Sequence, residues 1–405
     1  MYQIKINGIV QGVGFRPFIY KLAIEQKLTG YVLNSTNGVQ IEAEGNEDSL
    51  DQFIYRIKNE LPPAAVIIDF QYKNYPNKGY DTFEIRMSSQ SEGSTLISPD
   101  LAVCDDCIIE FNDHDDPRFQ YAFINCTNCG PRYSIIEETP YDRPVTSMKN
   151  FAMCNYCRGE YEDPLNRRFH AQPVACPQCG PQLQFLNKDL SSILGDPIEN
   201  TIKALKDGKI VGIKGIGGFH IACDATNYDA VELLRQRKNR PHKPFAVMCS
   251  ETNISDIVQI DKMQLELLKS PTAPIVILPK KENNELVPKP LFGNDDSYSQ
   301  TGVWEQEKSR KIAENVAPQN PNIGIFLPYA PHHYQFVTEK LPFVIMTSGN
   351  NSNEPIAREE EEIQNLCDCF LTHNRPILNR SDDSIILPAK KQNILIRRSR
   401  GFVPS

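Results

Sequence analysis

The sequence predicts a chain of three successive domains: an α+β domain, a small cysteine-rich module, and an α/β domain with a twisted, mixed sheet. Three observations support this order. Strand and helix patterns follow a β-α-β-β-α-β order over residues 1–90, paired cysteines gather in residues 91–190, and helices alternate with strands over residues 191–405. A chain of 405 residues is long enough for two or three domains, each with its own core.

The first domain shows the clearest sequence of elements. Residues 9–16 form a glycine-bearing loop, and Pro17 suits the first turn of the helix that follows. The complete order, which is the ferredoxin-like pattern, consists of a strand at 2–8, a helix at 17–28, strands at 30–35 and 39–44, a helix at 47–60, and strands near 66–72 and 82–86.

The glycine loop is the first candidate site. A loop that runs into a helix N-terminus presents backbone N–H groups to an anion, and Arg16 at this junction can fork onto phosphate oxygens. The run Val-Gln-Gly-Val-Gly-Phe-Arg, with Gly-Tyr-Val-x-Asn further on, resembles acylphosphatases over about residues 1–88. The resemblance implies that Arg16 holds a phosphoryl group and Asn34 orients the attacking water. The less favoured interpretations are that Arg16 forms a surface salt bridge and that Asn34 is a turn residue.

The second domain is defined by a repeated cysteine pattern. A C-x2-C-x18-C-x2-C unit occurs twice at an offset of 50 residues, and the offset also relates Glu110 to Glu160 and Arg118 to Arg168. Two such turns complete a tetrahedral S4 shell, which suits zinc better than a disulfide framework or an iron–sulfur cluster. The eight predicted ligands are Cys104, Cys107, Cys126, Cys129, Cys154, Cys157, Cys176 and Cys179.

We expect two structural zinc ions, because eight thiolates fill two sites and leave no open position. Pairing within each repeat is the simple assignment, and pairing across the repeats stays open. The module has little apolar material, so zinc should contribute strongly to its folding, with about 10–16 kcal/mol of apparent binding free energy in small domains. His170 is expected beside the ligands or between domains. The remaining cysteines are expected to be core thiols: Cys223, Cys249, Cys367 and Cys369.

The third domain carries cations in its loops. Lys214 opens a strand-to-loop glycine turn that ends at His220 and lacks the ending of a Walker A motif. Further basic residues follow a predicted helix at 228–238 and gather again near residue 398. Because the whole chain carries a net charge of −8, cations focused in the loops of one domain predict a nucleotide site.

Five segments of this domain resemble the YrdC-like domain: Lys-Gly-Ile-Gly-Gly-Phe-His, Lys-Asn-Arg-Pro-x-Lys-Pro-Phe-Ala-Val-Met, Thr-Ser-Gly-Asn, His-Asn-Arg-Pro-Ile and Arg-Arg-Ser-Arg-Gly. The resemblance implies binding of ATP. We expect Mg²⁺ to arrive with ATP, since no carboxylate cage is visible. The candidate ligands of the nucleotide or of a carbamoyl group are Lys214, His220, Lys238, Arg240, Lys243, Ser348, Asn350 and Arg398.

The order of the three domains resembles the HypF family of hydrogenase-maturation carbamoyltransferases. The resemblance implies hydrolysis of carbamoyl phosphate, passage of carbamate through the interior, and its attack on ATP to give carbamoyl adenylate. The carbamoyl group would then reach the C-terminal cysteine of a HypE-type partner, for the cyanide ligands of nickel–iron hydrogenase. Proteins of this family are expected to continue beyond the position of Ser405, so a fragment or a split protein is indicated. A polar insertion is expected at 281–315.

Two other functions stay open. A threonylcarbamoyl-adenylate synthase for tRNA modification would share the third domain, although the acidic charge and the acylphosphatase-like region argue against it. A non-catalytic zinc scaffold would not need both Arg16 and Asn34. The start lacks a signal peptide, no apolar run reaches the length of a membrane span, and metal-type cysteine pairs suit a reducing compartment, so we expect a cytoplasmic protein.

Overall fold

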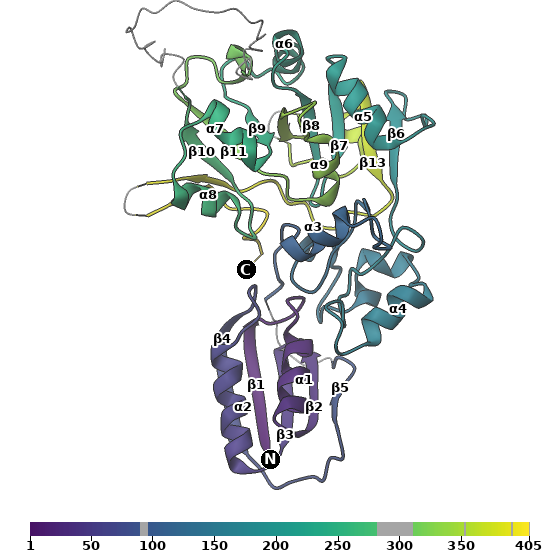
Figure 1. Cartoon of the computed structure of the whole chain (residues 1–405), viewed down its shortest axis with the longest axis vertical. Helices are drawn as coiled ribbons and strands as arrows, with labels where there is room; N and C mark the ends of the chain where they lie inside the picture. Colours follow the sequence, from purple (N-terminus) through teal and green to yellow (C-terminus); the bar gives the residue numbers. More distant parts are fainter. Residues whose placement is uncertain (90–95, 282–310, 352–353, 390–391, 405) are drawn as a thin grey trace, which may run out of the picture.

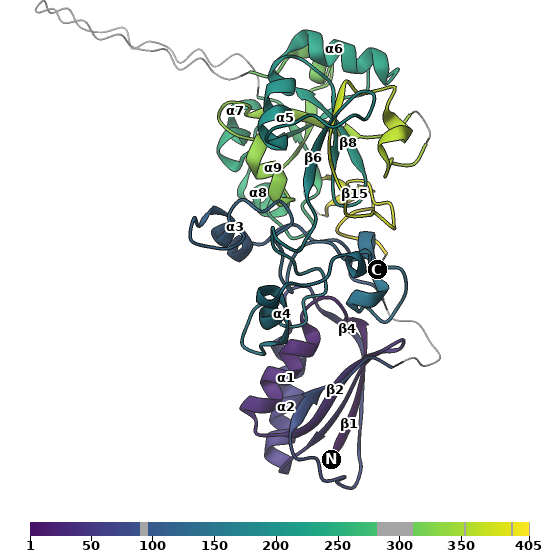
Figure 2. The same cartoon turned by 90° about the vertical axis from the view of Figure 1, so that its right-hand side faces the viewer.

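The computed structural model describes residues 1–89, 96–281, 311–351, 354–389 and 392–404. Three units follow one another along the long axis of the molecule, with the cysteine-rich module between the other two (Figures 1 and 2). None of the helices in these ranges is long and apolar enough to span a bilayer.

The first unit is a five-stranded sheet with two helices on one face (Figure 1), and the predicted ferredoxin-like order is confirmed. The strand order is β4-β1-β3-β2-β5, in which β2 and β5 are parallel and the other neighbours are antiparallel. Phe15 and Phe53, one from each helix, lie in its core. The elements are β1 Tyr2–Ile9, α1 Phe15–Glu25, β2 Thr29–Ser35, β3 Gly38–Glu44, α2 Glu47–Asn59, β4 Val66–Asn74 and β5 Phe83–Ile85.

The module contains little regular structure. Its two short helices, α3 Asp105–Asn112 and α4 Asn155–Glu162, each begin directly after the first cysteine of a pair. The second cysteine pair of each repeat lies in a tight turn further along the chain. Three 3-10 turns, at 133–135, 143–145 and 147–150, connect the two repeats. Most of the chain here is therefore held by side-chain contacts rather than by helix or sheet hydrogen bonds.

Each repeat contacts the other through equivalent residues. Arg118 of the first repeat is fully buried and pairs with Glu160 of the second. Its counterpart Arg168 pairs with Glu110 of the first repeat. Each arginine also donates from Nε to a carbonyl oxygen of the other repeat, at 2.8 and 3.1 Å, to Ala175 and Asn125 respectively. Residues 50 positions apart thus play matched roles.

The third unit is built on a ten-stranded mixed sheet, as predicted, in the order β15-β14-β10-β11-β9-β12-β8-β7-β13-β6. Two apolar clusters form its core. Strand β6 precedes the predicted boundary at residue 190 and pairs with β13 at the edge of this sheet. The strands are β6 Leu183–Asn187, β7 Val211–Lys214, β8 Phe219–Asp224, β9 Ala246–Cys249, β10 Ile275–Pro279, β11 Asn322–Phe326, β12 Phe343–Ser348, β13 Cys369–His373, β14 Ile385–Leu387 and β15 Ile394–Arg397.

The helices of this unit follow the predicted alternation. They are α5 Pro197–Lys206, α6 Tyr228–Arg237, α7 Ile254–Ile257, α8 Lys262–Leu268 and α9 Pro331–Phe336. The four cysteines outside the repeats are buried, in agreement with their prediction as core thiols. Of the insertion expected at 281–315, residues 282–310 lie outside the described residues.

Candidate functional site

The glycine loop turns the chain sharply into helix α1. Gly12 and Gly14 have φ angles of 72° and 73°, a left-handed conformation that favours glycine. The helix begins at Phe15 directly after Gly14, so its first turn offers backbone N–H groups that have no partner within the helix. Arg16 lies in this turn and is buried. The local geometry is that of an anion site at a helix N-terminus.

The structure brings Arg16 and Asn34 together. Asn34 is on the neighbouring strand β2 and is buried. With its amide oxygen turned toward the guanidinium, it accepts from Nη2 and Nε of Arg16 at 3.2 Å each. Arg16 also donates from Nη1 to Ser88 Oγ at 3.4 Å. A cation and an amide therefore converge beside the loop.

The module closes over this loop. A small cavity of about 20 Å³ lies between the two units and is lined by both. On the side of the module, Asp142 approaches Arg16 to 2.8 Å and forms an ion pair with it. His170, which was expected beside the ligands or between domains, lines the cavity between them. Burial and the nearby Arg16 lower the pKa of His170 to about 4, so its imidazole is neutral near neutral pH.

Arg132 fastens the loop to the first cysteine repeat. Its buried guanidinium donates from Nε to the carbonyl oxygen of Gly12. The remaining N–H groups point to carbonyl oxygens of the module at 2.8–3.1 Å, those of Cys126, Thr127, Cys129 and Pro131. A second link joins Tyr141 N to Gln11 Oε1 at 2.9 Å. The shape of the glycine loop thus depends on two units.

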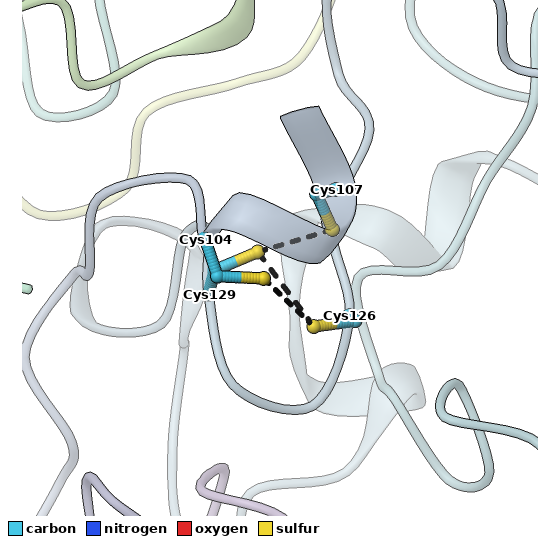
Figure 3. A group of neighbouring side chains, drawn as sticks. All are labelled: Cys104, Cys107, Cys126 and Cys129. Atoms are coloured by element: carbon cyan, nitrogen blue, oxygen red, sulfur yellow. Dashed lines mark hydrogen bonds between the residues drawn. The ribbon is translucent and has the colours of Figure 1, made fainter. Parts of the chain in front are cut away.

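The eight paired cysteines form two groups, each made from one repeat. Figure 3 shows the first group, whose side chains converge. A tetrahedral zinc ion with Zn–S bonds of about 2.3 Å places its sulfurs about 3.8 Å apart. The separations recorded are 3.4–3.8 Å in the first group and 3.7–3.8 Å in the second, which fit that geometry. The pairing that the sequence left open is therefore the pairing within repeats.

Arginines stand beside both sulfur groups. Arg167 donates to Cys107 Sγ at 3.2 Å, and Arg118 donates to Cys157 Sγ at 3.3 Å. A neighbouring cation favours the thiolate form, which is the form that binds a metal. Each set of four sulfurs fills all four positions around a tetrahedral ion and leaves none for water or a substrate, as in structural zinc sites.

In the third unit, a cavity of about 430 Å³ is lined by residues of strands β9 to β12, β14 and β15. Three predicted residues line it: Arg240, Lys243 and Ser348. Arg240 donates to Thr347 Oγ1 at 3.1 Å and stacks over the Phe245 ring at 4.7 Å. The predicted Lys238 and Asn350 are joined to each other beside it, because Lys238 Nζ donates to the Asn350 carbonyl and amide oxygens at 2.9 and 3.2 Å.

The cations at this cavity repel one another. Burial, followed by the charge of Arg240, lowers the pKa of Lys238 to about 8. Burial, followed by the charge of Arg235, lowers the pKa of Arg240 to about 10. The charge of Arg240, followed by burial, also lowers the pKa of Lys243. Each charged form would be stabilised by an anion placed among them, so the cavity is electrostatically suited to a polyphosphate.

The other three predicted residues lie elsewhere. Lys214 lines a separate cavity of about 380 Å³, where Glu359 and Glu360 are 3.6 and 3.8 Å from its amine. His220 is buried, with Nε2 2.8 Å from a carboxylate oxygen of Asp383. Arg398 is exposed. Its neighbour Arg397 lines the larger cavity and pairs with Asp382 there. Arg397 was not among the individually predicted ligands.

Sequence reasoning missed Arg132, Asp142, Thr347 and Asp382. Thr347 could have been found, since it begins the quoted Thr-Ser-Gly-Asn segment. Arg132 and Asp142 belong to the module but act on the first unit, and nothing in their local sequence indicates that contact. Only the packing of the two units brings them to the loop.

Comparison with known proteins agrees with this architecture. Three family models match: acylphosphatase over residues 2–85, the HypF finger over 103–136 and 153–186, and a family described as telomere recombination, which includes YrdC, over 203–301 and 299–399. An acylphosphatase of Pseudothermotoga lettingae is 42% identical over 83 residues, covering 20% of this chain and 92% of its own length.

These domains define a multidomain protein with acylphosphatase, zinc-finger and YrdC-like parts. A carbamoyltransferase HypF of Synechocystis is 43% identical over 99% of this chain and 50% of its own length. A crystal structure of full-length HypF in the phosphate- and nucleotide-bound form superimposes with a TM-score of 0.89, at 43% identity over 100% of this chain and 50% of that one. The chain belongs to the HypF carbamoyltransferase family, and it spans about half the length of the curated relatives it matches.

Proposed function

We propose that this chain hydrolyses carbamoyl phosphate at the Arg16–Asn34 site and forms carbamoyl adenylate from carbamate and ATP in the third unit. The carbamoyl group is destined for the C-terminal cysteine of a HypE-type acceptor, for cyanide ligands of nickel–iron hydrogenase. Family membership supports the reaction class. The domain ranges that go with this proposal are 1–90, 91–190 and 191–405.

At the first site, the loop N–H groups and Arg16 hold the phosphoryl oxygens. Arg16 forms charge-assisted hydrogen bonds that strengthen as charge builds on those oxygens in the transition state. The amide of Asn34 orients a water for attack on phosphorus. The bond between phosphorus and the bridging oxygen breaks, that oxygen leaves with carbamate, and phosphate takes up the attacking water oxygen. Closure by the module shields the reaction from bulk water.

At the second site, a carbamate oxygen attacks the α-phosphorus of ATP and pyrophosphate leaves. The role proposed for Arg240 and Lys243 is to neutralise the triphosphate and the charge that develops on the leaving group. Ser348 and Asn350 contact the nucleotide or the carbamoyl group. Mg²⁺ accompanies ATP. Lys214, His220 and Arg398 are retained as further candidates, although Lys214 lines a separate cavity.

Two zinc ions support the module that joins these sites. Their role is structural, because each set of four thiolates completes a closed shell. Through Arg132, the first zinc group also supports the loop that binds phosphate.

The observation that carries the proposal is the convergence of Arg16 and Asn34 at the glycine loop. The test measures phosphate released from carbamoyl phosphate, and AMP and pyrophosphate released when ATP and magnesium are added. Arg16→Ala should lose both activities, since the second step needs carbamate from the first. Arg86→Ala, which removes a more exposed arginine of the same unit, should keep both. Near-normal phosphate release by Arg16→Ala would reject the assignment.

The same assay separates the other functions. Bicarbonate with threonine, supplied in place of carbamoyl phosphate, should give no pyrophosphate. Pyrophosphate formed under those conditions would indicate a threonylcarbamoyl-adenylate synthase. Absence of turnover under both conditions would indicate a scaffold.

A further inference from the structure

The cavity above Arg16 has an unequal distribution of hydrogen-bonding groups. The first unit contributes mainly donors, namely the loop N–H groups and the Arg16 guanidinium. The wall from the module must therefore contact whatever group is attached to the phosphoryl. The nature of that wall determines which acyl phosphates are accepted.

Most side-chain acceptors near the cavity already have partners. Gln172 Oε1 accepts from Arg143 N at 2.8 Å and from the Tyr161 hydroxyl at 3.0 Å. Gln11 Oε1 accepts from Tyr141 N at 2.9 Å. The Asn34 oxygen faces Arg16.

Asp142 is the anionic acceptor at this place. None of the described residues that line the cavity has a carboxylate, whereas Asp142, which follows the lining residue Tyr141, contacts the lining residue Arg16 at 2.8 Å. The Asp142 side chain is 28% exposed, so it is not sealed in the core. Although Asp142 precedes the 3-10 turn at Arg143–Val145, its side chain does not cap that turn. Its carboxylate therefore has no capping role that would account for its position.

We propose that Asp142 recognises the amino group of the carbamoyl moiety and makes the Arg16 site selective for carbamoyl phosphate over other acyl phosphates. This inference rests on the proposed function of that site. A carbamoyl amino group carries two N–H donors, and the methyl group of acetyl phosphate, which is of similar size, carries none. One donor bonds to Asp142 and the other to the imidazole of His170 or to water.

Asp142 also disfavours acyl phosphates that lack an N–H donor, such as acetyl phosphate. A carboxylate close to a phosphoryl dianion is repelled by it and competes with it for Arg16. An N–H donor between the two anions offsets that repulsion, whereas a methyl group leaves it uncompensated. Selectivity of this kind combines a favourable contact with a penalty for the substrate that lacks the donor.

The test compares kcat/KM for carbamoyl phosphate and acetyl phosphate, and uses the ratio so that effects on shared phosphate binding cancel. In Asp142→Ala the ratio should fall at least about tenfold, the loss expected for one charge-assisted hydrogen bond. Acetyl phosphate hydrolysis should rise in the same variant. Asp142→Asn, which keeps a neutral acceptor of the same shape, should give an intermediate ratio. Glu138→Ala, an exposed acid of the same module, should match the wild type.

Other outcomes decide against the inference. A ratio unchanged within twofold in Asp142→Ala, with both substrates hydrolysed faster and phosphate bound more tightly, would mean that Asp142 only competes for Arg16. If Asp142→Ala fails to fold, the nearly isosteric Asp142→Asn carries the comparison, and an unchanged ratio there overturns the inference. Wild-type protein that hydrolyses neither substrate would instead reject the proposed function, so the two failures are distinguishable.

Discussion

Arg16 and Asn34 touch each other but should contribute differently to hydrolysis. Arg16 carries the charge that is proposed to meet the phosphoryl oxygens, and Asn34 carries a neutral amide suited to orienting water. The loss of each side chain should therefore appear in a different kinetic constant.

We expect Asn34→Ala to lower kcat for carbamoyl phosphate by about 100-fold, with a KM within about threefold of wild type, because a positioned catalytic group is worth that order of rate. Arg16→Ala should also lose inhibition by inorganic phosphate. Steady-state kinetics with phosphate as the inhibitor measure both effects. Equal loss of phosphate affinity in the two variants would contradict the division of roles.

Lys238 should change its protonation state when ATP binds. Its lowered pKa of about 8 means that it is half protonated at pH 8, and a polyphosphate nearby should raise that pKa. ATP binding at pH 8 should therefore take up protons. Calorimetry in buffers of different ionisation enthalpy measures this uptake. It should shrink at pH 6, where Lys238 is already charged, and in Lys238→Met. Adenosine is the control, and uptake as large with adenosine as with ATP would oppose the assignment.

The module depends on its sulfur groups more than on its helices. Helices α3 and α4 have eight residues each, which is too short for stability in isolation. Purified protein should contain about two zinc ions per chain. Cys104→Ser should reduce this to about one and lower the melting temperature of the module. Cys249→Ala, a buried thiol outside both groups, should keep both ions. Elemental analysis checks the count, and fewer than two ions in wild type would contradict it.

Arg132 connects the first sulfur group to the glycine loop. Replacing Arg132 by Met would leave buried carbonyl oxygens without donors, each costing roughly 1–3 kcal/mol. We expect the free energy of unfolding to fall by at least about 2 kcal/mol and KM for carbamoyl phosphate to rise. Denaturant unfolding and steady-state kinetics measure these. Arg158→Met, which changes an exposed arginine of α4, is the control. Unchanged KM would show that the loop holds its shape without Arg132.

The two proposed reactions belong to different units of the molecule. Lys243→Ala should reduce formation of pyrophosphate at least about tenfold, since Lys243 is proposed to stabilise the triphosphate. It should leave phosphate release from carbamoyl phosphate unchanged, because Lys243 lines a cavity of the third unit and the Arg16 cavity lies between the first unit and the module. Parallel assays of both products test this, and loss of both activities would indicate a shared site.

The sequence predicted the fold class and the loop because these depend on local patterns. Strand alternation and Pro17 located the elements of the first unit, and cysteine spacing located both sulfur groups. Lys214 and Arg240, both predicted for one nucleotide site, line different cavities. Motifs that share one domain can face different cavities of its sheet. Asp142 was missed because its contact joins residues 126 positions apart in different units. The domain boundaries and the role of each site residue stay predictions.

The two repeats of the module contact each other through equivalent residues. In a two-fold homodimer the two subunits contact each other in the same reciprocal way, so the module resembles a dimer joined into one chain. In a true homodimer, one mutation changes both copies, whereas covalent joining frees each copy to diverge. Arg132 and its counterpart Gln182 differ in their contacts. The Arg132 side chain donates to the glycine loop of the first unit, and the main-chain N–H of Gln182 donates to Asn374 Oδ1 of the third. Equivalent positions of the two repeats thus join the module to different neighbours.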